Sequence, residues 1–275
     1  MATKISFIGT GEAFDPDRAN TSYLIKSDSG TILVDCGYDV PKSLMRFLAQ
    51  EKRSVADIPN SLLITHEHGD HTAGIPALLM PIWEEINGVV GNRRYGFGRR
   101  LDIISAHQNI QEIVEKSMSS NYQGFLERFK REGPNIAYRT LDQQGETVDV
   151  FKISFAKTSH SVANFAYRFE CPNKKSFAIS GDGALTDESK EFFQGVNLLI
   201  HEGFLINGDG GANHATVEQV VAYAIKSGIK HLAIVHVNRE QRTDDIIKIL
   251  SYANKKGIYL FFPDDHIELN LEKFE

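Results

Sequence analysis

The feature that most constrains this chain is the run Thr-His-Glu-His-Gly-Asp-His at positions 65–71. It follows a short apolar run, 61–64, and precedes a helix-compatible segment, 72–80. We therefore predict a loop that leaves the end of a strand. In extended backbone, residues two apart point the same way, so His66 and His68 can converge on one point beside the strand end.

The second half of the same run supplies Asp70 and His71, after a glycine that lets the chain turn. These two side chains can face a second point close to the first. Such an arrangement suits two hydrolytic metal ions, which typically lie about 3.5–4 Å apart and activate one water. Imidazole and carboxylate ligands without thiolate favour zinc, manganese or iron in an open site. The alternative is a polar surface loop whose histidines cluster by chance.

Composition sets broad limits on the class of protein. The chain has 275 residues, 41% of them hydrophobic, which is enough for one large α/β domain. The formal charge of −6 gives no overall attraction to nucleic acid. Only two cysteines occur, so a disulfide framework is not expected. We see no cationic leader and no apolar run near the ~20 residues of a membrane helix. A cytoplasmic protein without a membrane partner is expected.

Further candidate ligands lie at other predicted strand ends. His160, Asp182 and His236 each follow a predicted strand, as His66 does, and loops at strand ends are where functional side chains concentrate. Asp35 also ends a predicted strand. It could hold a metal-bound histidine in place through a hydrogen bond, or it could simply form a turn.

The segment 81–135 differs in character, and we expect a variable lid or helical insertion there. Its part Arg93–Arg100 combines glycines, arginines and aromatic residues. It could close over a substrate, with arginines on phosphate and aromatics on a base, or it could be a solvated loop. Beyond it, alternation over 148–155 predicts a single strand.

The order His-X-His-X-Asp-His, a distant histidine, an aspartate and a final histidine resembles the metallo-β-lactamase superfamily over nearly the whole chain. The resemblance implies an α/β fold, a four-layer αβ/βα sandwich, as a single domain over 1–275. It also implies two divalent metal ions, zinc foremost, with manganese or iron possible. The implied ligands are His66, His68 and His160 for one ion, Asp70, His71 and His236 for the other, and Asp182 as a bridge.

Two further elements, His201-Glu202-Gly203-Phe204 and Asn213-His214-Ala215-Thr216, resemble motifs of the ribonuclease Z and phosphodiesterase branch. That resemblance implies that Glu202 orients His214 and that His214 is the general acid. The expected catalytic residues are thus Asp70, Glu202 and His214. The alternative is an ordinary pair at a strand end and a helix start. The β-lactamases carry a cysteine where Asp182 stands, which argues against their activity.

The expected activity is hydrolysis of a small phosphodiester by metal-activated hydroxide. The chain departs from the branch pattern at Gly183 and at Val237-Asn238, and we see no long basic arm for gripping transfer RNA. A cyclic nucleotide is therefore the leading substrate, as for similar phage-type phosphodiesterases. Transfer-RNA 3′ processing and thioester or lactone hydrolysis are the alternatives, and a non-catalytic metal-binding sensor is a further one. The resemblance also implies a homodimer. Neither the base of the substrate nor the metal follows from the sequence.

Overall fold

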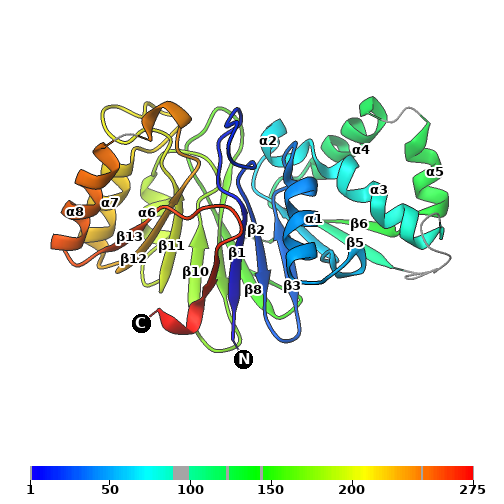
Figure 1. Ribbon diagram of the computed structural model, residues 1–275, viewed down its shortest axis with the longest axis horizontal. Helices are drawn as coiled ribbons and strands as arrows, with labels where there is room; N and C mark the ends of the chain where they lie inside the picture. Colours follow the sequence, from blue (N-terminus) through cyan, green and yellow to red (C-terminus); the bar gives the residue numbers. More distant parts are fainter. Residues whose placement is uncertain (1, 89–98, 122–123, 143–144, 243, 275) are drawn as a thin grey trace.

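The structure is a computed structural model that describes residues 2–88, 99–121, 124–142, 145–242 and 244–274. Within these ranges two seven-stranded sheets lie face to face (Figure 1). The first sheet has the order β14 (Glu268–Asn270), β1 (Lys4–Gly9), β2 (Ser22–Lys26), β3 (Thr31–Val34), β4 (Ser61–Ile64), β5 (Arg100–Ser105), β6 (Asn135–Thr140). The second has the order β13 (Tyr259–Phe261), β12 (His231–Val235), β11 (Leu198–Glu202), β10 (Ser176–Ile179), β9 (Phe165–Glu170), β8 (Phe151–Lys157), β7 (Glu146–Val148).

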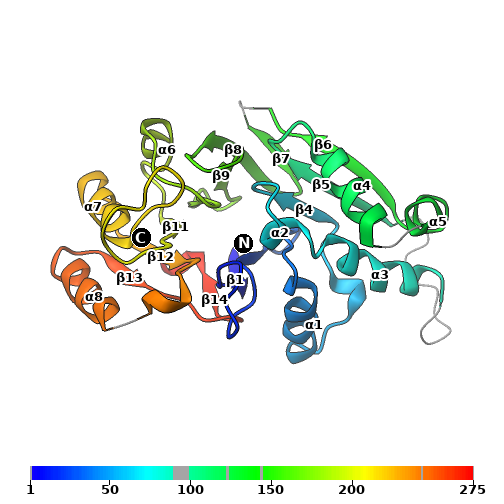
Figure 2. The same ribbon diagram turned by 90° about the horizontal axis from the view of Figure 1, so that it is seen from above.

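Helices cover the outer face of each sheet, as Figure 2 shows from above. On the first sheet these are α1 (Val40–Gln50), α3 (Ile75–Ile86), α4 (Ile110–Asn121) and α5 (Phe125–Glu132). On the second they are α6 (Asp187–Phe192), α7 (Val217–Ser227) and α8 (Asp245–Lys255). Short 3-10 turns span Val55–Asp57, Arg239–Gln241 and Leu271–Lys273. The four layers confirm the expected αβ/βα sandwich. None of the described helices has the length and apolar character needed to cross a membrane.

The strands are apolar on both faces because each sheet packs against the other sheet on one face and against helices on the other. In β4, Leu63 faces the core between the two sheets, whereas Leu62 and Ile64 face the helices on the outside. This two-residue alternation inside a fully buried strand is typical of parallel strands under a helical layer. β4 pairs in parallel with β3 and β5, and β10, β11, β12 and β13 are parallel to one another. Their carboxyl ends therefore open on the same edge of the sandwich.

Two expected elements are each divided in two by a turn. The single strand predicted over 148–155 is wrong: β7 ends at Val148 and β8 begins at Phe151, with Asp149 at φ 52° between them. Aspartate tolerates this left-handed conformation, which allows the chain to fold back as a hairpin. The helix predicted over 72–80 is also divided, into α2 (Gly69–Thr72) and α3. At the break, a Cβ on Gly74 would lie 1.9 Å from the carbonyl oxygen of Gly37, so only glycine fits.

The expected lid, Arg93–Arg100, falls mostly outside the described residues. Its two described members contact the protein itself rather than facing a ligand. Nε of Arg99 donates to Asn60 Oδ1 at 2.8 Å, its guanidinium also bonds the carbonyl of Ile58, and its side chain is 10% exposed. Arg100 pairs with Asp102 at 2.6 Å. Arg99 and Arg100 therefore make contacts at the start of β5, and the choice between a lid and a solvated loop stays a prediction.

Candidate metal centre

The predicted metal ligands all lie at one edge of the sandwich, beyond the carboxyl ends of the strands. This is the edge where open α/β sheets hold their ligands. His66 follows β4, His68 precedes α2, and His160 lies between β8 and β9. Asp182 follows β10, His236 follows β12, and α2 carries Asp70 and His71. Strands from both sheets thus contribute to one site.

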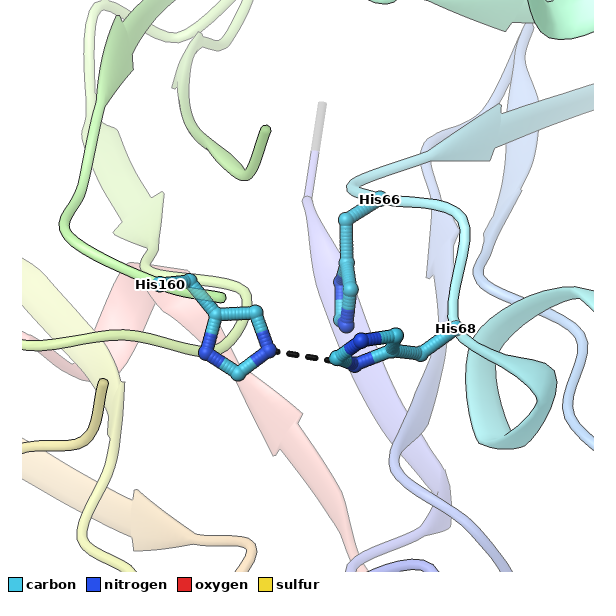
Figure 3. Close-up of side chains that lie close together, drawn as sticks. All are labelled: His66, His68 and His160. Atoms are coloured by element: carbon cyan, nitrogen blue, oxygen red, sulfur yellow. Dashed lines mark hydrogen bonds between the residues drawn. The ribbon is translucent and has the colours of Figure 1, made fainter. Parts of the chain in front are cut away.

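Three histidines form the first group. The candidate ligand atoms of His66, His68 and His160 lie within 4.8 Å of one another. Figure 3 shows their rings converging, with His160 approaching from the opposite sheet. Nε2 of His160 lies 3.1 Å from Nδ1 of His68. Nδ1 of His160 donates to the carbonyl of Asn213 at 2.8 Å, which directs Nε2 of the same ring at the shared centre.

Two carboxylates and two histidines form the second group. The candidate ligand atoms of Asp70, His71, Asp182 and His236 also lie within 4.8 Å of one another, and all four residues are buried. Asp182 lies between the groups. Its Oδ2 is 3.1 Å from Nε2 of His236 and 3.9 Å from Nε2 of His66, and its Oδ1 is 3.4 Å from Nε2 of His71.

Neighbouring side chains fix the orientation of the histidine rings. Nδ1 of His71 donates to Oδ2 of Asp35 at 2.8 Å. Asp35 also accepts hydrogen bonds from the backbone N–H and the hydroxyl of Thr65, both at 2.8 Å. That hydroxyl lies 3.0 Å from Nδ1 of His66. Of the two roles considered for Asp35, the structure therefore shows the hydrogen bond that orients a histidine. This bond holds Nδ1 of His71 and leaves Nε2 of His71 available to another partner.

The polar atoms at the centre are suited to a cation. Nε2 of His66, Nε2 of His71 and Oδ1 of Asp182 are buried without a hydrogen-bond partner. Buried polar atoms are normally paired, so three unpaired polar atoms that converge in one place are the kind of cluster that a cation can satisfy. Imidazole nitrogens and carboxylate oxygens are the donors that zinc, manganese and iron accept. The residues therefore fit the two divalent ions that the sequence predicted.

The charges of the site are strongly coupled. Burial alone would lower the pKa of His71, but the carboxylates of Asp182 and Asp35 outweigh it and raise that pKa well above its usual value. Burial would raise the pKa of Asp182, but His236 and His71 lower it well below its usual value. The two shifts have opposite directions because each group favours the charged form of the other. A metal would bind Nε2 of His71 only in its deprotonated form, so metal binding and protonation compete there.

Glu202 and His214 lie beside both groups. Glu202 ends β11 and is fully buried, and its carboxylate accepts three backbone N–H groups, from Gly183 at 3.1 Å, Ala215 at 2.7 Å and Phe204 at 2.7 Å. Nδ1 of His214 lies 3.3 Å from Oε1 of Glu202, an ion-pair contact rather than an aligned hydrogen bond. The pair expected from the motifs is therefore in contact.

His214 is placed to face a substrate. Its ring lies 5.0 Å from that of His160 and stacks on Phe204 at 4.6 Å between centroids, and its side chain is 23% exposed. Burial lowers its pKa, but the nearby carboxylate of Glu202 outweighs this and the pKa is raised above its ordinary value. A histidine that stays protonated near neutral pH can donate a proton.

Some contributors to the site were not expected from the sequence. Thr65 connects Asp35 to the histidines, and the hydroxyl of Thr21 lies 3.4 Å from Nδ1 of His236. The backbone carbonyl of Asn213 orients His160. Thr65 could have been noticed because it directly precedes His66. Thr21 and the carbonyl of Asn213 carry no local signal, because their partners are distant in the sequence.

Replacing Asp35 with asparagine is expected to weaken metal binding by about 10–100-fold, the usual cost of losing a group that orients a metal-bound histidine. Asparagine has one uncharged oxygen in place of the two carboxylate oxygens that accept the hydrogen bonds of His71 and Thr65. Zinc affinity by competition with a chelating dye measures the effect. Asp39→Asn is the control, since the carboxylate of this exposed aspartate in the same loop accepts the N–H of Asn20, a bond that the asparagine oxygen can also accept. Equal affinity in the two variants would contradict the orienting role.

Comparison with known proteins places the chain in a family. A family model described as anti-Pycsar protein Apyc1 matches residues 3–256. The chain belongs to this family. An Apyc1 protein of Bacillus phage BSP38 is 32% identical over 42% of this chain and 40% of its own. A ribonuclease Z of Metallosphaera sedula is 23% identical over 98% of this chain and 99% of its own. The crystal structure of the metallo-β-lactamase fold protein YhfI from Bacillus subtilis superposes with a TM-score of 0.75 at 21% identity. The match covers 98% of this chain and 100% of the YhfI chain.

Membership in the Apyc1 family confirms the superfamily and the ribonuclease Z-like branch that the motifs indicated. Together with the two clustered ligand groups, it makes this chain a metal-dependent hydrolase of the phosphodiesterase type. The cofactor is accordingly a set of divalent metal ions held by histidine and aspartate.

Proposed function

We propose that this Apyc1-family protein hydrolyses a small phosphodiester, a cyclic nucleotide, to a linear nucleotide. The observation that carries the proposal is the Glu202–His214 pair beside the two ligand groups. A phosphodiester needs a proton donor for its departing alkoxide, whereas a thioester releases a thiolate, which departs without one. Relatives named anti-Pycsar protein and the net charge of −6 support a small substrate over a long RNA.

In this proposal, His66, His68 and His160 would hold one ion, Asp70, His71 and His236 would hold the other, and Asp182 would be shared between them. Zinc is the proposed metal. Bound there, two such ions supply Lewis-acid polarisation of the phosphoryl oxygens and a nucleophilic water at neutral pH. The protein binds the phosphate at this centre and aligns the departing oxygen with His214. Water adds to phosphorus and gives up one proton to solvent, the ring P–O bond breaks, and the proton of His214 goes to the departing oxygen. His214 then regains a proton from solvent. Glu202 keeps His214 protonated and in place.

Transfer-RNA 3′ processing is the second candidate, because a ribonuclease Z matches over nearly the full length of the chain. The two activities differ in how the substrate is held. A long RNA is bound through many phosphates, so its affinity falls steeply with salt. A cyclic nucleotide has one phosphate, and its binding should depend only weakly on salt.

We expect the zinc-loaded protein to open 3′,5′-cyclic nucleotides in a panel that also contains linear dinucleotides and a precursor transfer RNA. A chelator should abolish turnover and zinc should restore it, because the proposed reaction depends on metal held by the convergent candidate ligands. Manganese- and iron-loaded samples show which ion is most active. Cyclic-nucleotide opening no faster than in the metal-free protein would reject the proposal. Salt-sensitive cleavage of the RNA alone would instead establish the processing nuclease.

A further inference from the structure

An exposed aromatic ring lies directly on the candidate metal loop. Tyr38 is 62% exposed, although it belongs to the loop between β3 and α1 that packs under the site. A Cβ built on Gly69 would meet the Tyr38 hydroxyl at 2.0 Å. Gly69 stands between the candidate ligands His68 and Asp70, so the hydroxyl end of the Tyr38 ring lies against the metal loop between two of those ligands.

The backbone that carries Tyr38 is held firmly against the metal loop. The N–H of Cys36 donates to the carbonyl of His71 at 2.8 Å, and the N–H of Gly74 donates to the carbonyl of Cys36 at 2.9 Å. A Cβ on Gly37 would lie 2.0 Å from the carbonyl oxygen of Asp70, so the two loops are in direct backbone contact. A ring on such a support loses little conformational freedom when it binds a ligand.

The ring of Tyr38 packs against Gly69 and is otherwise largely open to solvent. Within the described part of the chain, the Tyr38 hydroxyl has no hydrogen-bond partner, and more than half of the side chain faces solvent. An exposed aromatic ring offers a face on which a base can stack. A nucleotide whose phosphate lies at the two ligand groups extends its sugar and base over the neighbouring loops, and Tyr38 lies in contact with one of them.

We propose that Tyr38 is a substrate-binding residue on which the base of the nucleotide stacks. This inference rests on the proposed function and assigns the base-binding surface of the same site. Stacking on an aromatic face tolerates every base, so Tyr38 contributes affinity for nucleotides as a class rather than selecting one base. Its contribution should appear in KM, because the base does not change during the reaction.

The test compares Tyr38→Ala and Tyr38→Phe on a cyclic nucleotide and on the same sugar cyclic phosphate without a base. In Tyr38→Ala, KM for the cyclic nucleotide should rise about 5–150-fold, the range of a lost base–aromatic stack, with kcat unchanged. Turnover of the base-free diester should remain at the wild-type level. Tyr38→Phe should keep the wild-type KM, because the stacking face remains. Tyr259→Ala is the matched control: this tyrosine is 65% exposed on β13, far from the metal loop in the sequence and in the fold.

The outcomes separate this inference from the proposed function. Wild-type protein that opens neither diester rejects the function itself. If the wild type opens both and Tyr38→Ala has an unchanged KM, only the stacking role is rejected. An equal loss on the base-free diester, or a Tyr38→Phe variant as impaired as Tyr38→Ala, also overturns it. Light scattering on each variant covers the remaining explanation: a KM change that accompanies dissociation of a dimer would mean that Tyr38 contacts a second copy instead.

Discussion

Replacing His214 with alanine is expected to lower kcat for cyclic-nucleotide hydrolysis by about 10²–10⁴-fold, the usual contribution of a positioned general acid. The metal content should stay at the wild-type level, since neither group of candidate ligands includes His214. The loss should shrink for a diester whose leaving group is a nitrophenolate, because such an anion departs without a proton. Steady-state kinetics on both substrates measure the effect. Equal losses on the two substrates would contradict the role of acid.

The same assignment predicts the direction of a pH shift. A general acid works in its protonated form, so the rate falls as pH rises through the pKa of His214. Burial lowers that pKa, and the carboxylate of Glu202 raises it by more. Glu202→Gln removes the raising charge, so the alkaline limb of the kcat/KM profile should move to lower pH. Glu218→Gln, a change on the exposed face of α7, should leave the limb in place. A limb that does not move in Glu202→Gln would disprove the coupling.

Replacing Asp182 with asparagine is expected to abolish binding of two metal ions and reduce turnover to the level of the metal-free protein. Asp182 is buried between the two groups, with Nε2 of His66, His71 and His236 within 3.9 Å of its oxygens. An amide lacks the negative charge that two adjacent cations need between them. Metal analysis after dialysis should show less than one zinc ion per chain.

A thermal readout tests the same change without reference to activity. A ligand that binds only the folded state at 1,000 times its Kd stabilises a protein by about 4 kcal/mol. For a chain of this size that is a rise of roughly 8 °C in Tm. Zinc should produce such a rise in the wild type and in Asp187→Asn, an aspartate fully exposed on α6. Asp182→Asn should lose most of it. An undiminished rise would show that the zinc binds elsewhere.

Much of the fold followed from local pattern. Alternation and turn residues located most of the strands, for example β2 and β12 with the bounds that the structure has. The errors lie where a contact made elsewhere decides the local structure. The hairpin at Asp149 interrupts a run that reads as one strand, and Gly74 divides a helical run because the backbone of Gly37 lies against it. Periodicity reports which face is apolar and does not report where a distant segment approaches.

The sequence alone determined the chemistry of the candidate site. The spacing of His66, His68 and Asp70 and the strand-end positions of the other candidates are local properties, so they indicated a metal-dependent hydrolase before any coordinates. The tertiary structure decided which neighbours those residues contact. Asp35 accepts a hydrogen bond from His71, the carbonyl of Asn213 accepts one from His160, and the ring of Tyr38 packs against Gly69. Each of these contacts joins segments that are far apart in the chain. They exist because the order of the strands within each sheet brings distant strand ends to one edge, and no local pattern of side chains encodes that order.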